Sequence, residues 1–365
     1  MSGISLDLLL AMRHQKTHPP PPLPDNVSFR NRTILITGSS TGLGLASAHQ
    51  FASLGAAHII LAVRNLSAGN DAADALRTTN PSLRTTVMHV DMLSAASISS
   101  FADKVAKEVP RLDIAVLNAG VTKTTQVLVP GTGLEEVIAV NSVGTALLAA
   151  LLLPKLRQAR RELIDEDKIA PTPGGAYPHL IIVSSNMHTR IPSSALPSPT
   201  STVPVLKELS EPKSYQINIQ YGVSKLLVMW SIPHLSSLAG PASDPDVLIT
   251  TTCPGPCRSD LGRELTVGAG WIKRMAVEGF SRTFQRETSE GARVIVGAAT
   301  VEWNGKDKGL LSGQGVFWMD GKGVEKGELV DNDLGRKLGG KVWREMVELW
   351  KSEGVDVEGL GLHRA

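Results

Sequence analysis

The feature that most constrains the fold of this chain is a glycine-rich turn between an apolar segment and a helical one. Residues 33–37, TILIT, run directly into TGSSTGLG, whose glycines are Gly38, Gly42 and Gly44. Glycines at such a turn let the backbone approach a pyrophosphate, and the following helix offers unpaired N–H groups and the positive end of its dipole. The order is G-x-x-x-G-x-G rather than the commoner G-x-G-x-x-G, so the prediction depends on the position of the turn between strand and helix. The turn predicts a dinucleotide-binding site.

From Arg32 onward, short apolar runs alternate with segments of helix length. Runs that are apolar throughout suit the strands of a parallel sheet that is buried on both faces. We expect strands at residues 33–37, 58–63, 85–90, 113–117, 179–183, 247–252 and 315–319. We expect helices at residues 43–54, 68–79, 95–108, 134–156 and 222–238. This alternation predicts the α/β class: a Rossmann-type, doubly wound, mainly seven-stranded parallel sheet with helices on both faces.

We expect one large domain with an addition at each end. Residues 1–31 form an N-terminal extension with a stiff spacer, HPPPPLP, and residues 331–365 form a helical C-terminal extension. Residues 32–330 form the dinucleotide-binding domain, because single α/β domains often exceed about 250 residues. Within it, residues 186–219 are rich in Ser, Pro and Thr and match neither a strand nor a helix pattern. They are expected to be an insertion near the active site, either a lid or a surface loop.

Charge and composition favour a small-molecule partner over nucleic acid. The 37 basic and 35 acidic side chains give a formal net charge of +2, without the clustered basic excess that nucleic acid requires. The two cysteines, Cys253 and Cys257, exclude a disulfide scaffold, and no metal site is expected. No apolar stretch approaches the roughly 18–20 residues of a membrane span, so a cytoplasmic protein is expected. Residues 4–12 predict a frayed helix packed on the domain or, alternatively, a weak peripheral membrane contact.

TGSSTGLG resembles the cofactor turn of the short-chain dehydrogenase/reductase family, and further landmarks of that family follow in the same order. They are Asn118-Ala119-Gly120 (N-A-G), Asn141 (the helix asparagine), Ser184-Ser185 (the end of the fifth strand), Tyr221 to Lys225 (Y-x-x-x-K), Pro254-Gly255 (P-G) and Ser259-Asp260-Leu261 (where T-D-L is common). A lone Y-x-x-x-K has little specificity, but six landmarks in order are specific. The resemblance covers roughly residues 32–320 and extends to retinol-dehydrogenase-like and fungal ketoreductase-like members.

The resemblance implies that Asn141, Ser185, Tyr221 and Lys225 are catalytic. Tyr and Lys four positions apart share one face of a helix. A free phenol has a pKa near 10, and a neighbouring ammonium and a positive nicotinamide are expected to lower that pKa. Tyr221 would then be the general acid or base, and Ser185 rather than Ser184 would bind the substrate oxygen. By the same resemblance, Lys225 also holds the cofactor ribose, and Asn141 helps to hold a water beside the lysine.

The expected cofactor is NADP(H). Members that prefer NAD usually carry an acidic residue at the end of the second strand, which binds the adenosine 2′-hydroxyl. Here Val63 is followed by Arg64, whose guanidinium can pair with a 2′-phosphate, although it can equally be an ordinary solvated charge. Asp91 and Met92 match an adenine-contacting pair or, alternatively, a helix N-cap region. The other cofactor-binding positions that the resemblance implies are Gly38, Ser40, Thr41, Gly42, Leu43, Gly44, Asn118, Ala119, Gly120, Tyr221, Lys225, Pro254, Gly255, Cys257 and Ser259.

The leading hypothesis is an NADP(H)-dependent oxidoreductase that moves a hydride between the nicotinamide and a carbonyl or alcohol of a lipophilic small molecule. A tailoring ketoreductase in natural-product biosynthesis would fit. Apolar side chains after the P-G segment can face such a substrate, but at helical spacing they can equally be plain packing; they are Trp271, Ile272, Met275 and Phe280. Two other classes stay open: a non-redox enzyme, such as a cyclase or dehydratase, and a catalytically silent dinucleotide-binding regulator. The family is often a homo-oligomer, which the sequence does not decide.

Overall fold

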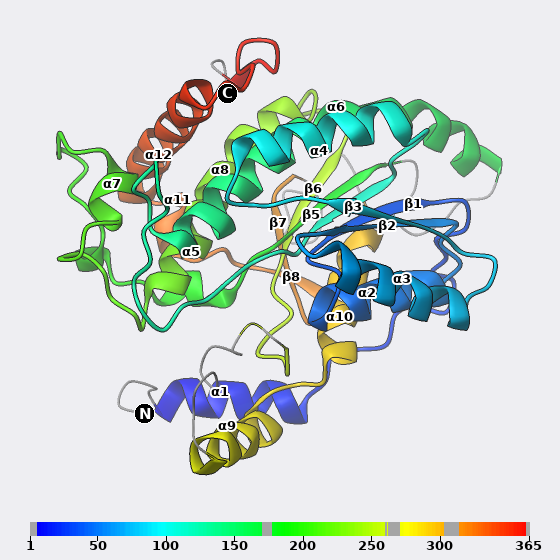
Figure 1. The fold of residues 1–365 in the computed structure, drawn as a ribbon, viewed down its shortest axis with the longest axis horizontal. Coiled ribbons are helices and arrows are strands. Elements are labelled where there is room, and N and C mark those ends of the chain that lie inside the picture. The colour runs from blue at the N-terminus through cyan, green and yellow to red at the C-terminus, as the bar shows by residue number, and fades with distance from the viewer. Residues whose placement is uncertain (1–5, 170–176, 260, 262–270, 303–313, 363–365) are drawn as a thin grey trace.

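A computed structural model describes residues 6–169, 177–259, 261, 271–302 and 314–362. The described strands form one eight-stranded sheet in the order β3-β2-β1-β4-β5-β6-β7-β8, with β1 to β7 parallel and β8 antiparallel to β7 (Figure 1). The strands are β1 Thr33–Thr37, β2 His58–Val63, β3 Arg84–His89, β4 Ile114–Leu117, β5 His179–Val183, β6 Leu248–Thr252, β7 Val316–Met319 and β8 Lys322–Val324. The doubly wound α/β class is confirmed, and the eighth strand adds to the seven that were expected.

Helices cover both faces of this sheet. The α-helices are α1 Leu6–Thr17, α2 Gly42–Ser53, α3 Leu66–Thr79, α4 Ala95–Glu108, α5 Glu136–Ile138, α6 Thr145–Ile169, α7 Val205–Leu209, α8 Gln220–Leu238, α9 Trp271–Phe284, α10 Thr288–Gly297, α11 Glu328–Asp331 and α12 Asp333–Ser352. A π-helical turn, Ala139–Gly144, joins α5 to α6. Short 3-10 helices follow β5 at Asn186–Arg190 and Ser193–Ala195 and follow α10 at Ala298–Thr300.

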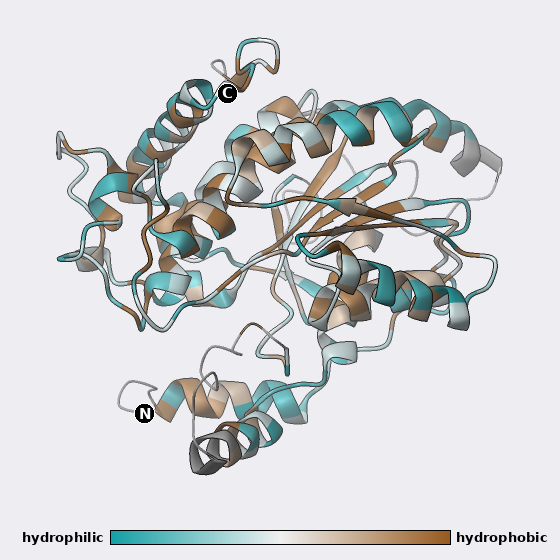
Figure 2. Cartoon of the chain, in the orientation of Figure 1, coloured by the Kyte–Doolittle hydropathy of each residue, from teal (hydrophilic) through white to brown (hydrophobic). Residues whose placement is uncertain are grey.

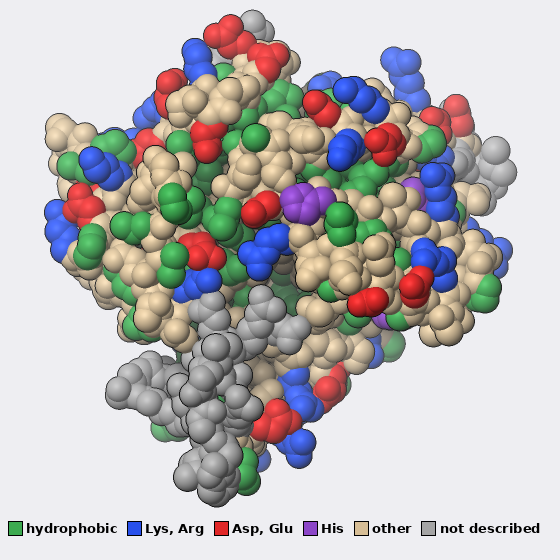
Figure 3. Space-filling view, in the orientation of Figure 1, with side chains coloured by type: hydrophobic (Ala, Val, Ile, Leu, Met, Phe, Trp, Pro, Cys, Tyr) green, Lys and Arg blue, Asp and Glu red, His purple; other side chains and the backbone are tan. Residues whose placement is uncertain are grey.

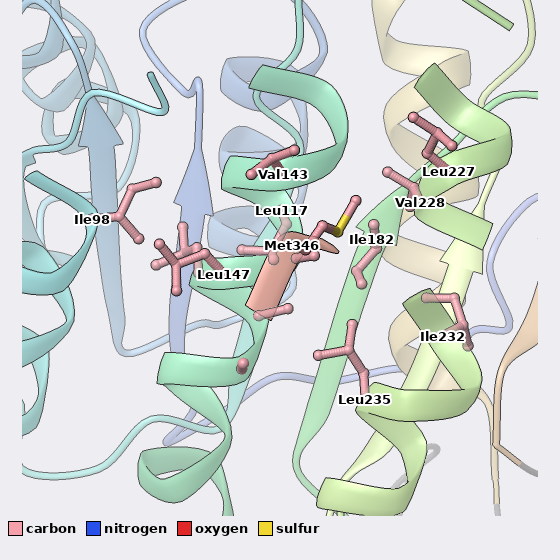
Figure 4. Packing of buried hydrophobic residues seen from close by; sticks show 14 of the residues in the cluster. Ile98, Leu117, Val143, Leu147, Ile182, Leu227, Val228, Ile232, Leu235 and Met346 are labelled. Atoms are coloured by element: carbon pink, nitrogen blue, oxygen red, sulfur yellow. The ribbon is translucent and has the colours of Figure 1, made fainter. Parts of the chain in front are cut away.

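The core is divided in two by the sheet, because successive side chains of a strand point to opposite faces. Leu35 and Ile60 face the layer of α4, α6, α8 and α12, whereas Ile34 and Ile59 face α2, α3 and α10. Figure 2 shows the strands largely in brown between helices whose outer faces are teal. Figure 4 shows the first layer from close by, where Leu147 of α6 and Met346 of α12 meet side chains from the sheet and α8. On the face seen in Figure 3, acidic and basic side chains are interspersed.

The segment 136–165 corrects the expectation that no apolar stretch is long enough to span a membrane. By length and composition it would pass as a membrane span. However, 89% of its most apolar window is buried inside the protein, between the sheet and its neighbouring helices. The segment is therefore the central core helix of this face.

The insertion at residues 186–219 is more ordered than its composition predicted. It contains two 3-10 helices and α7, whose Val205, Leu206 and Leu209 are buried. Two backbone N–H groups at the start of α7, those of Val205 and Leu206, donate to the Glu345 carboxylate of α12 at 2.7 and 2.8 Å. The sequence of this segment shows no persuasive helix pattern, because α7 is short and a carboxylate about 140 residues away caps it.

Candidate active site

The glycine turn has the geometry that a close backbone approach requires. Gly38 and Gly42 have φ of 63° and 57°, in the left-handed region that favours glycine. A Cβ added at Gly44 would lie 2.4 Å from the carbonyl oxygen of Gly38, so only glycine fits there. Thr41 precedes α2 in an extended conformation, and its side chain makes no capping hydrogen bond within the described residues. The first N–H groups of α2 therefore remain available to an anion.

Residues at the end of β4 hold the glycine turn in place through hydrogen bonds. The backbone N–H groups of Asn118 and Ala119 both donate to the Thr37 hydroxyl, at 3.0 and 2.9 Å. The Asn118 side-chain amide donates to the carbonyl oxygens of Thr37 and Gly38, at 3.0 and 3.3 Å. The N-A-G segment therefore positions the glycine turn, and it brings the ends of β1 and β4 together where the order of strands reverses. Such a switch point is where doubly wound sheets bind ligands.

Ser185, Tyr221 and Lys225 come together at the ends of β5 and the start of α8. The Ser185 side chain lies beside Tyr221, close enough to lower the pKa of its phenol. The Lys225 ammonium lies 5.7 Å from the centre of the Tyr221 ring and donates to the carbonyl oxygen of Val183 at 2.8 Å. Ser184 is buried, and its hydroxyl has no hydrogen-bond partner in the described structure. Of the two serines, Ser185 is thus the one next to the tyrosine.

Burial dominates the electrostatics of this group. Desolvation raises the pKa of Tyr221, the neighbouring Cys253 raises it further, and the neighbouring Ser185 side chain opposes both. Desolvation also lowers the pKa of Lys225 to about 8. The pKa of Tyr221 is therefore raised in the protein alone, because loss of water outweighs the influences that favour the phenolate. The expectation of a lowered pKa concerned the site with a positive nicotinamide, and it stays a prediction. Cys253 was not among the predicted site residues, although it directly precedes Pro254 of the P-G segment.

Asn141 sits in the π-helical turn Ala139–Gly144 and is fully buried. Its side-chain oxygen accepts from the Val121 N–H at 2.8 Å, and its amide donates to the Val121 carbonyl and the Ser224 hydroxyl at 2.9 and 3.0 Å. A Cβ at Gly120 would be 3.2 Å from the Asn141 oxygen and 3.8 Å from the Lys225 ammonium. Asn141 thus ties the segment after β4 to α8, with Gly120 between it and the lysine.

The predicted adenosine end lies at the ends of β2 and β3. Arg64 follows β2, is exposed, and forms no ion pair with any described residue. The Asp91 carboxylate accepts from the Leu93 N–H at 3.0 Å, and the Asp91 N–H donates to the Ser97 hydroxyl at 3.0 Å. Asp91 therefore shapes the turn that leads into α4, whose N-cap is Ser94, and the adenine contact of Asp91 and Met92 stays a prediction. Arg64 is free to meet an anion.

The P-G turn, Pro254–Gly255, follows β6, and Gly255 has a φ of 76°. Cys257 is buried, and its thiol donates to the Pro254 carbonyl at 3.5 Å. Burial raises the pKa of Cys257 to about 12, so this thiol is not a reactive thiolate at neutral pH. Ser259 is half-buried, and Asp260 lies outside the described residues. The turn therefore meets the ends of β5 and β6 beside the tyrosine.

The predicted substrate-facing side chains after this turn are only partly described. Met275 is exposed, and the Phe280 ring packs against Phe284 with centroids 5.0 Å apart. The side chains of Trp271 and Ile272 lie outside the described part of the chain. Phe280 thus contacts a neighbour on its own helix, and a role of these side chains toward a substrate stays a prediction.

A glycine turn at β1, the strand ends beside it and a Tyr–Lys pair on α8 define a dinucleotide-binding oxidoreductase of the Rossmann type. Comparison with known proteins agrees. Residues 32–164 match the family model described as short chain dehydrogenase. The chain is 34% identical over 336 residues to the short-chain dehydrogenase/reductase phmF of Phaeosphaeria nodorum, covering 91% of this chain and 90% of that protein. It is 32% identical over 342 residues to ffsI of Aspergillus flavipes, covering 93% and 92%.

Solved structures share the fold at lower identity. A short-chain type dehydrogenase/reductase from Mycobacterium marinum aligns with a TM-score of 0.54 at 18% identity, covering 81% of this chain and 97% of that one. A 3-oxoacyl (acyl-carrier-protein) reductase from Agrobacterium tumefaciens with NADP bound aligns with a TM-score of 0.52 at 18% identity, covering 80% and 95%. The chain belongs to the short-chain dehydrogenase/reductase family, whose members are oxidoreductases that bind a nicotinamide dinucleotide.

Proposed function

We propose that the protein is an NADP(H)-dependent reductase or dehydrogenase in which Tyr221 exchanges a proton with the oxygen of a carbonyl or alcohol substrate. The observation that carries the proposal is the proximity of the Ser185 and Tyr221 side chains, with Lys225 on the same side of α8. Two neighbouring hydroxyls can both reach one substrate oxygen. A silent regulator would have no need of this arrangement.

The chain's own residues fit a nicotinamide dinucleotide. Gly44 leaves no room for a Cβ, so the turn is compact against α2. The first N–H groups of α2 can hold the pyrophosphate. NADPH, when bound, supplies the hydride. Ser185 would donate a hydrogen bond to the substrate oxygen and hold it, and Tyr221 would give its phenolic proton to that oxygen as the carbonyl becomes an alcohol. The phenolate left on Tyr221 would then be reprotonated from solvent.

Arg64 supports NADP(H) over NAD(H). Its guanidinium lies at the end of β2, where an acidic residue would bind a 2′-hydroxyl, and it has no competing ion pair among the described residues. A guanidinium in this position can form charge-assisted hydrogen bonds with a 2′-phosphate. An Arg64→Ser variant would test this choice directly.

A lipophilic substrate is supported by apolar side chains on the segments that flank the site. Val127 and Leu128, in the segment after the N-A-G residues, and Ile217, just before α8, are exposed. The Gln126 amide donates to the Ser210 carbonyl at 2.8 Å, so this segment is fastened to the insertion. We propose that the insertion forms part of the entrance for a hydrophobic ketone. Because these relatives are fungal, the first class of reaction to examine is a tailoring step in secondary metabolism.

The deciding experiment is a panel of carbonyl substrates followed by NADPH absorbance, with NADH alongside and product analysis to establish stoichiometry. Consumption of one NADPH per alcohol, lost in Tyr221→Phe, would support the proposal. Conversion of substrate without NADPH consumption would favour a cyclase or dehydratase. NADPH binding without any turnover would favour a regulator.

A further inference from the structure

Arg286 is a buried cation, 0% exposed, that joins three distant parts of the chain. Its Nε donates to the Gln15 carbonyl at 2.8 Å, and its Nη2 donates to the His18 carbonyl at 3.1 Å. Its Nη1 donates to the Asp320 carboxylate at 2.6 Å and to the Pro254 carbonyl at 3.4 Å. One guanidinium therefore holds the end of α1, the turn between β7 and β8, and the P-G turn of the active site.

The carbonyl groups at the end of α1 reduce the free-energy cost of burying the Arg286 guanidinium. A buried charge is costly unless it is paired and its hydrogen-bonding groups are satisfied. Asp320 supplies the countercharge, and two carbonyls accept further hydrogens: that of Gln15 in the last turn of α1, at the negative end of the helix dipole, and that of His18 just after the helix. Removal of α1 would leave those donors without these protein partners. The helix is therefore a fixed part of the domain.

Gln15 brings α1 into contact with the P-G turn itself. A Cβ built at Gly255 would lie 3.1 Å from the Gln15 side-chain oxygen and 3.1 Å from Nη1 of Arg286. The Gln15 amide also reaches the Met319 sulfur at 3.9 Å, at the end of β7. The attachment continues beyond α1, since Arg293 donates to the Pro20 carbonyl at 2.8 Å.

The main chain of Arg286 also forms hydrogen bonds with the P-G turn and the residues that follow it. Its N–H donates to the Pro256 carbonyl at 2.8 Å, and its carbonyl accepts from the Arg258 N–H at 2.9 Å. Figure 1 shows α1 beside α9, the helix that precedes Arg286, so the two helices form one layer next to the P-G turn. Lys16 of α1 and Glu287 form an ion pair of 3.7 Å across this layer.

We infer that residues 6–24, here called the N-terminal wall, form one side of the active site, at the end where the nicotinamide and the substrate bind. Arg286 is the positioning residue that holds this wall on the P-G turn. The inference rests on the proposed function, because it takes the P-G turn to lie at the nicotinamide. Its consequence is that the N-terminal extension controls cofactor and substrate affinity.

The test inserts a protease recognition site between Asp25 and Asn26, which are exposed in a turn after the wall. The chain folds with the wall in place, and cleavage followed by removal of the peptide then exposes the P-G turn. We expect the NADPH dissociation constant and the substrate KM to rise about tenfold, the scale of a moderate coupling between sites, while the pH dependence of kcat stays the same. Addition of a synthetic peptide of residues 1–25 should restore both affinities.

Two variants separate positioning from general stability. Arg286→Lys keeps the charge but loses the planar fork that serves four acceptors, so it should raise the NADPH dissociation constant by about fivefold. Arg111→Lys is the matched control, because Arg111 also donates to a main-chain carbonyl, that of Asn31 at 2.6 Å, but lies just before β4, outside the wall and the P-G turn. It should change that constant by less than about twofold.

Unchanged NADPH and substrate affinities after removal of the wall, in protein that still unfolds cooperatively, would overturn the inference. Equal effects of the two arginine variants would do the same. An intact enzyme that binds NADPH but reduces no carbonyl contradicts only the proposed function, because the NADPH dissociation constant still reports on the wall.

Discussion

Replacing Gly44 by alanine tests the cofactor turn most directly. The added Cβ would lie 2.4 Å from the Gly38 carbonyl oxygen, 2.7 Å from the Asn118 amide nitrogen and 2.9 Å from the Gly38 carbonyl carbon, whereas ordinary contact begins near 3.4 Å. Two of these atoms are backbone, and Gly38 is itself held by its N–H bond to the Ala62 carbonyl at 2.9 Å. The clash therefore cannot be relieved by a change of rotamer, and the turn must move by about 1 Å.

The expected cost follows from that displacement. Overpacking of a rigid site costs about 1–3 kcal/mol of unfolding free energy. The displaced atoms belong to the turn proposed to cradle the pyrophosphate, so we expect the NADPH affinity to fall by more than tenfold, or about 1.4 kcal/mol. Denaturant unfolding and a fluorescence titration with NADPH measure the two effects separately.

Gly340 of α12 provides the control. A Cβ there would meet only the Arg344 guanidinium at 3.7 Å, so the same chemical change is made on a helix without obstruction. Gly340→Ala should raise the unfolding free energy by up to about 1 kcal/mol and leave NADPH binding unchanged. A Gly44→Ala protein with wild-type stability and wild-type NADPH affinity would refute the assignment of this turn.

Three further outcomes follow from the site. Tyr221→Phe should lower kcat by at least about 10²-fold while the NADPH dissociation constant stays within a factor of about two, as measured by steady-state kinetics and titration. Arg64→Ser should raise KM for NADPH but leave KM for NADH nearly unchanged, and an equal rise for both cofactors would contradict a 2′-phosphate contact. Burial raises the pKa of Glu135 above its unfolded value near 4.5, so the folded protein binds the extra proton. That contribution to stability is lost as the pH rises through the folded pKa, and Glu135→Gln should remove this decline in Tm above about pH 4.5.

The central sheet could be predicted because its signals are local. β1, β2 and β5 occupy the expected residues, since each is an uninterrupted apolar run that is buried on both faces. Helix α4 also has the expected bounds, and the Ser94 hydroxyl caps it by accepting from the Ser97 N–H at 3.1 Å. The glycine turn was recognisable for the same reason, because its conformation requires a residue type that can be read from the sequence.

The remaining elements depend on partners that are distant in sequence. α7 is five residues long and is capped by Glu345 of α12, while β8 has three residues and exists through its pairing with β7. Neither segment is long enough to show a period of its own. The contacts of Arg286 with α1 could not be predicted from the sequence either, because they are made to backbone carbonyls and do not depend on a pattern of side chains.

The raised pKa of Tyr221 bears on how such a site would work, because the protein alone does not favour the phenolate. Lys225 has its ammonium 5.7 Å from the centre of the Tyr221 ring and already donates to the Val183 carbonyl, and burial outweighs the influences that favour the phenolate. Oxidised nicotinamide cofactor, when bound, would supply a second positive charge beside the phenol. Tyr221 would therefore keep its proton in the protein alone, and it would give that proton to a substrate oxygen more readily with the second charge nearby.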